Sequence, residues 1–130
     1  HSTRRREKTP MEYMILIHSD ENAPRPVPGT PEFGEYMGTW LAFNQRLIDG
    51  GHWISGATLQ PTTTSTTIQR TFGGADTLVD GPFAETKEQL GGYYVISATD
   101  LDEALALAAG VPIPAGSVEV RPVAFRPDAA

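Results

Sequence analysis

The stretch from Asp80 to Ile96 constrains the fold of this chain more than any other, because a rigid turn, a charged segment and an apolar strand follow one another without spacers. Gly81 can adopt a positive φ, and Pro82 fixes its own φ and disfavours helical geometry in the residue before it. Asp80 can accept a hydrogen bond from the backbone two residues further on, as aspartate often does in turns. The stretch therefore predicts a tight turn that leads into a strand and holds one carboxylate on a stiff corner.

Hydrophobic periodicity predicts two helices around this turn. Helical spacing begins at Phe33 and ends at Gly50, whereas Asp100 and Glu103 have the spacing of a capping box at the start of a second helix. The apolar positions expected on the buried faces are Phe33, Tyr36, Met37, Trp40, Leu41, Leu47 and Ile48 in the first helix, and Leu101, Ala104, Leu105 and Ala108 in the second.

Strands are expected on either side of each helix and at the turn. The segments concerned are residues 14–17, 52–55, 62–71, 78–80, 93–97 and 118–121. The first reads as a central strand buried on both faces, and the third as a polar strand at an edge. The resulting order is β-α-β, a central hairpin and β-α-β. We therefore expect an α+β fold, a split βαββαβ with an extra central hairpin.

Composition indicates one domain and excludes several classes of partner. A chain of 130 residues buries roughly two-thirds of the surface that it exposes when unfolded, so we expect a single domain over residues 11–126, with a disordered leader or cloning remnant at 1–10 and a tail at 127–130. The formal net charge of -6 argues against nucleic-acid binding. The chain has no cysteine and no apolar run of roughly 20 residues, which predicts a soluble cytoplasmic protein without a membrane contact.

The expected fold leaves one face of the sheet without helices. Apolar side chains on such a face need a cover, and a second subunit provides it most economically. Two sheets that close face to face would enclose a cavity suited to a small molecule. We therefore expect a homodimer with a small-molecule site between the sheets.

Motifs for nucleotide hydrolysis, zinc proteolysis and esterase chemistry are missing, and no cofactor or metal site is predicted. The titratable candidates are His18 at a strand exit and Asp80 at the turn. An aspartate can orient an imidazole that moves a proton near neutral pH, so we predict a His18–Asp80 pair for acid–base catalysis. Tyr36, Trp40 and Glu85 are candidate ligand-binding residues, although aromatic residues at helical spacing usually belong to a core.

The run Asp80-Gly81-Pro82-Phe83, with its flanking strands, resembles the DGPF subgroup of the YCII-related family over about residues 11–125. The resemblance implies a ferredoxin-like α+β fold that dimerises as an α+β barrel. It also implies a histidine–aspartate site whose histidine lies on the first helix. Here that helix carries no histidine and offers Tyr36 or Trp40 instead, so only Asp80 carries over.

Two functions stay open at this stage, and whether the protein is an enzyme is undecided. One is a small-molecule-binding protein or acid–base enzyme with a cleft near Asp80. The other is a regulatory partner of an extracytoplasmic-function sigma factor, because the resemblance extends to proteins encoded beside such factors or fused to them.

Overall fold

The computed structural model describes residues 10–127 and confirms the predicted order of elements. The strands and helices are β1 (Met11–Ser19), α2 (Pro31–Asp49), β2 (Trp53–Thr58), the 3-10 helix η1 (Thr62–Thr64), β3 (Thr66–Gln69), β4 (Thr77–Asp80), β5 (Gln89–Ala98), α3 (Leu101–Ala108) and β6 (Ser117–Pro122). The expected leader and tail lie outside the described residues, except for Pro10 and Pro127.

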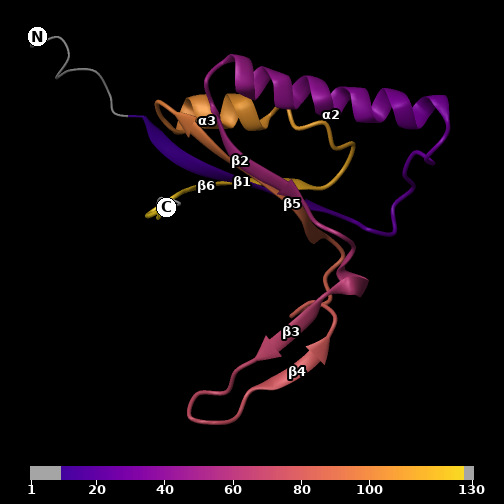
Figure 1. Cartoon of the computed structure of the whole chain (residues 1–130), viewed down its shortest axis with the longest axis vertical. Helices are drawn as coiled ribbons and strands as arrows, with labels where there is room; N and C mark the ends of the chain where they lie inside the picture. Colours follow the sequence, from indigo (N-terminus) through magenta and orange to yellow (C-terminus); the bar gives the residue numbers. More distant parts are fainter. Residues whose placement is uncertain (1–9, 128–130) are drawn as a thin grey trace, which may run out of the picture.

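Four antiparallel strands form the main sheet in the order β2-β5-β1-β6. Both helices lie against the same face of this sheet (Figure 1). This order, with β1 central and two helices on one face, is a ferredoxin-like α+β arrangement, as expected.

Side chains of β1 alternate between the two faces of the sheet. Tyr13, Ile15 and Ile17 are buried on the helix-covered face, whereas Met14 and Leu16 on the other face are half-buried. The strand is central, but the expectation that it is buried on both faces is wrong for a single chain, since no helix covers the second face. We call that second face the open face.

Helix α2 begins at the predicted place because Thr30 caps it, its hydroxyl accepting a hydrogen bond from the Phe33 amide at 3.3 Å. Its buried side chains are Phe43 and Leu47, at 1 % and 0 % exposure. Three residues expected on the buried face are exposed instead: Met37, Leu41 and Ile48. The buried residues form a neighbouring stripe along the helix. The sequence pattern does not distinguish the two stripes, because both are apolar.

Helix α3 has the predicted capping box. Asp100 accepts from the Glu103 amide at 2.9 Å, and Glu103 accepts in return from the Thr99 amide at 2.8 Å. Ala104 and Ala108 are buried as expected. Leu101 and Leu105 are exposed, which corrects the expectation, because small alanines let the helix lie close to the sheet and leave the leucines at the rim.

Strands β3 and β4 pair only with each other among the described strands and form a hairpin that we call the arm, residues 66–80. The predicted polar strand at 62–71 is therefore divided into η1 and β3. The arm projects away from the helices, beyond the open face of the sheet (Figure 1). Its base is closed by a hydrogen bond from the Gly81 amide to the Ser65 carbonyl, at 2.8 Å.

Neither described helix combines the length and the apolar character that a membrane span requires.

Candidate functional site

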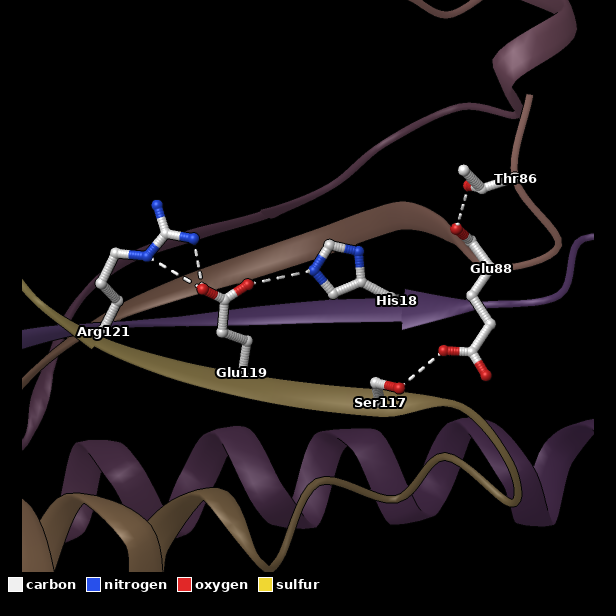
Figure 2. Close-up of polar contacts among 6 residues, drawn as sticks. All are labelled: His18, Thr86, Glu88, Ser117, Glu119 and Arg121. Carbon is white, nitrogen blue, oxygen red and sulfur yellow. Dashed lines mark hydrogen bonds and ion pairs between the residues drawn. The ribbon is translucent and has the colours of Figure 1, made fainter. Parts of the chain in front are cut away.

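Polar side chains form a row on the open face, along the ends of β1 and β6. Residues 117, 119 and 121 of β6 share this face because strand side chains alternate. In the register of the two strands, Leu16 lies opposite Glu119 and His18 lies opposite Ser117. The Nε2 atom of His18 lies 3.6 Å from Oε1 of Glu119 (Figure 2). The sheet thus pairs an imidazole with a carboxylate on a face that the helices do not cover.

Arg121 fixes the second oxygen of the same carboxylate. Its Nε donates to Oε2 of Glu119 at 2.9 Å, and its Nη2 donates to the same oxygen. The hydrogen bonds and charge of Arg121 lower the pKa of Glu119 from its ordinary value, and His18 adds to this effect. Glu119 is therefore ionised at neutral pH and lies within ion-pair distance of the imidazole. A carboxylate at this place can orient a histidine that acts as a general base.

A cleft of about 210 Å³ lies beside this row, at the end of β1. One wall is the proline-rich segment after β1, which includes Pro24 and Pro26. Tyr36 of α2 and the segment 113–116 supply other parts of the lining. The rigid proline-rich segment thus forms one wall of the cleft.

Charged groups at the cleft differ in whether they have partners. Asp20 accepts a hydrogen bond from the Asn22 amide at 2.9 Å, and Glu88 accepts from the Ser117 hydroxyl at 2.6 Å (Figure 2). Lys87 has no ion pair within residues 10–127, whereas Arg25 donates a long hydrogen bond to Ser19 Oγ, at 3.5 Å, and its charge helps to lower the pKa of Glu21. The cleft therefore carries two acidic and two basic side chains beside an apolar lining, and Lys87 is the basic group without an ion pair in the described residues.

A larger groove of about 340 Å³ lies between α3 and β6. Its lining contains apolar side chains and backbone but no titratable side chain. The smaller cleft is the better candidate site because charged side chains line it and because its lining includes Ser19, the residue after His18.

Glu21 joins the segment that lines the cleft to the base of the arm. Its carboxylate accepts from the Thr62 amide at 2.9 Å and from the Thr62 hydroxyl. These two hydrogen bonds lower the pKa of Glu21, the hydroxyl contributing more. The loop and η1 are thereby held together.

Asp80 lies at the end of β4, opposite Thr66, and is exposed. Gly81 has the predicted positive φ, +103°. The Asx-type hydrogen bond expected for Asp80 is not among those of residues 10–127, where this carboxylate has no partner. The turn is held instead by the Gly81 amide and by the Thr67 hydroxyl, which donates to the Gly81 carbonyl at 2.7 Å.

The other predicted site residues fall into different surroundings. Tyr36 lines the cleft. Trp40 makes edge-to-face contacts with Tyr36 and Phe43, at 6.4 and 6.5 Å between ring centroids, and packs against the core. Glu85 is exposed beyond the turn. Tyr36 belongs to the cleft on the helix side, His18 contacts Glu119 on the open face, and Asp80 belongs to the arm, so the structure does not bring these three together.

Sequence reasoning missed Glu119 and Arg121. The alternation of valine with charged residues showed that they share a face of the last strand, but only the register of β6 against β1 places them beside His18. No group of three or more His, Asp or Glu side chains suited to a metal ion occurs in the part of the chain that the structure describes.

Comparison with known proteins places the chain in a family. The model of the YCII-related domain matches residues 11–125. An uncharacterised protein of Rhizobium meliloti (strain 1021) is 38 % identical over 119 residues, covering 88 % of this chain and 94 % of the relative. Together with the ferredoxin-like sheet, these matches show that the chain belongs to the YCII-related family.

Proposed function

We propose that this protein binds a small organic acid in the cleft at the end of β1 and that His18 transfers a proton to or from the bound molecule. The observation that carries this proposal is the His18–Glu119 contact, at 3.6 Å, one residue along β1 from Ser19, which lines the cleft of about 210 Å³. The proposal moves the predicted site from Asp80 to the end of β1, where His18 and the first lining residue of the cleft, Ser19, are neighbours in sequence.

The charges at the cleft support a carboxylate as the ligand. Both acidic side chains there accept hydrogen bonds from the protein, whereas Lys87 has no ion pair within the described residues. The apolar part of the ligand would lie against Tyr36 and the prolines. A compact acid with an aromatic or aliphatic body fits both features.

Binding is tested with a set of aromatic and aliphatic carboxylates and with their primary amides, which have the same shape but no charge. Ligand-observed NMR should detect the acids and not the amides. Lys87→Gln should weaken acid binding about tenfold or more, since it removes a charge-assisted contact. Arg70→Gln is the matched control, because it removes one positive charge on the arm, where Arg70 pairs with Asp76. Equal binding of acids and amides would contradict the proposed ligand class.

Proton transfer is tested by the exchange of α-protons of bound acids in D₂O, followed by ¹H NMR. His18→Gln should lower the exchange rate by about 100-fold or more, the usual size of a general-base contribution, while binding persists. Glu119→Gln should also slow exchange by misorienting the imidazole. If His18→Gln still binds acids and the exchange rate of their α-protons is unchanged, the protein binds acids but His18 does not transfer protons.

We also propose that a second copy of the chain covers the open face. Met14, Leu16 and Tyr93 lie there half-buried, without a helix over them. A face-to-face partner would remove this apolar surface from water and would shield the His18–Glu119 contact, which strengthens it.

A further inference from the structure

The arm exposes large apolar side chains to an unusual extent. Phe72 at its tip turn is 107 % exposed and Leu78 is 73 % exposed. Ile68 lies directly opposite Leu78 in the hairpin, so both project from one face of the arm, and it is 56 % exposed. Just beyond the arm, Phe83 is 87 % exposed. Clustered apolar surface of this kind marks an interaction site.

This apolar arm lies on the side of the molecule that the helices leave open (Figure 1). The half-buried side chains of Met14, Leu16 and Tyr93 belong to the same side. A partner that binds the open face can therefore also contact the arm. The open face and the arm are both accessible from the same side of the molecule (Figure 1).

We propose that the arm is a clasp for a second copy of this chain, so that each protomer lies between the open face and the arm of its partner. The proposal rests on the pairing of open faces proposed above and adds the arm to that interface. Two-fold symmetry favours this occupant, because one self-complementary contact covers both arms and both open faces.

The size of the apolar surface agrees with a stable dimer. Burial of an aromatic side chain removes about 150 Å² or more from water, so the rings of Phe72 and Phe83 in two protomers would supply roughly 600 Å². A standard interface buries about 1,600 Å² in total. The aliphatic side chains of the arm and of the open face can supply the remainder.

Charge favours a second copy over a basic partner such as a sigma factor. The ionic groups beside Ile68 and Leu78 on the arm are few, and Arg70 pairs with Asp76 at 3.3 Å. A surface adapted to a basic protein would present unpaired carboxylates at its centre. Here the centre is apolar, and Asp80 lies at the inner end of the same face.

The test measures the dimer dissociation constant of the full chain by sedimentation equilibrium. The arm variant combines Ile68→Thr, Phe72→Ser and Leu78→Thr; threonine preserves the β-propensity of the hairpin. We expect its Kd to rise at least about 100-fold, as for the loss of several interface anchors. Leu41→Gln is the matched control, because Leu41 is 66 % exposed on α2, on the helix side. Its Kd should not change.

A photo-crosslinking experiment gives a second readout that does not depend on destabilised variants. The photoreactive residue p-benzoylphenylalanine, placed at position 72, should yield a covalent dimer on irradiation, whereas the same residue at position 41 should not. Mass mapping should locate the crosslink on the partner chain.

The outcomes separate this inference from the proposals on which it rests. If Leu16→Gln dissociates the dimer while the arm variant keeps the wild-type Kd and position 72 does not crosslink, the clasp is overturned and the pairing of open faces stands. A wild-type chain that stays monomeric up to millimolar concentration overturns both. A monomer that binds a purified sigma factor through the arm also overturns the second copy as occupant. Carboxylate binding is measured separately from all of these.

Discussion

At the scale of single residues, the turn Asp80-Gly81-Pro82-Phe83 after the arm depends on Gly81 for its backbone conformation. Gly81 has a φ of +103°, and a Cβ built there meets nothing within 4 Å. The requirement for glycine is therefore one of backbone conformation and not of space.

Gly81→Ala isolates that requirement. It should lower the free energy of unfolding by about 1–3 kcal/mol, because a residue with a side chain is strained at this φ. Gly34→Ala is the control, since Gly34 also has open space around it but lies in helix α2, where alanine is favoured by up to about 1 kcal/mol. Urea denaturation of both variants measures the contrast; equal effects would show that the turn tolerates any residue.

Asp80, in contrast, should be replaceable without loss of stability. Its exposed carboxylate has no hydrogen bond in residues 10–127, so Asp80→Asn should change the free energy of unfolding of the monomer by less than about 0.5 kcal/mol. Thr67→Val should instead lower the local stability of the arm by about 1 kcal/mol, measured by hydrogen exchange of its amides, because the Thr67 hydroxyl holds the Gly81 carbonyl. A large loss in the free energy of unfolding of Asp80→Asn would show that the carboxylate does support the turn.

At the scale of elements, sequence reasoning succeeded where one pattern has one structural solution. The spacing of Asp100 and Glu103 predicted the start of α3. Glycines at 73–74 and the turn at 80–82 predicted the two ends of the second strand of the hairpin. It failed for α2, where Phe43 was missed and Leu41 was taken as buried, because two apolar stripes share that helix. It also failed to find Glu119, because pairing between β1 and β6, far apart in sequence, sets that contact.

The link between the cleft loop and η1 gives stability that depends on pH. The pKa of Glu21 is lowered in the folded chain, so the stabilisation is present above the ordinary value of 4.5 and is lost as pH falls through the folded-state pKa. Glu21→Gln should therefore melt at a lower temperature than the wild type at pH 7, and the difference should close as the pH is lowered past 4.5.

Thr62→Val removes the hydroxyl donor of this link and should reproduce part of the same pH-dependent difference. Thr64→Val is the matched control, because the Thr64 hydroxyl donates to the Pro61 carbonyl and not to Glu21. Scanning calorimetry from pH 7 to acid measures all three variants. A difference between Glu21→Gln and wild type that stays constant with pH would contradict the role of the carboxylate.

At the scale of the whole molecule, the structure is a ferredoxin-like body with an arm that pairs with no strand of the main sheet. The buried core contains residues of β1, α2, β5 and α3, and none from β3 or β4. Ser65 and Gly81 are already hydrogen-bonded at 2.8 Å where the arm joins the body.

Replacement of residues 66–80 by an Asn-Gly turn should therefore leave the monomer folded. We expect its free energy of unfolding to change by less than about 1 kcal/mol, since the loss lies at the surface, whereas self-association should weaken strongly. Circular dichroism, urea denaturation and sedimentation measure the two effects on one protein. A body that unfolds without the arm would show that the arm is part of the fold.

The isolation of the arm also has a consequence for hydrogen exchange. A hairpin of two strands is only marginally stable by itself, so in the monomer its amides should exchange through local opening. The amides of β1, held between β5 and β6, should exchange only when the whole domain unfolds. One exchange experiment on a dilute sample therefore resolves two separate stabilities in this chain, that of the arm and that of the body.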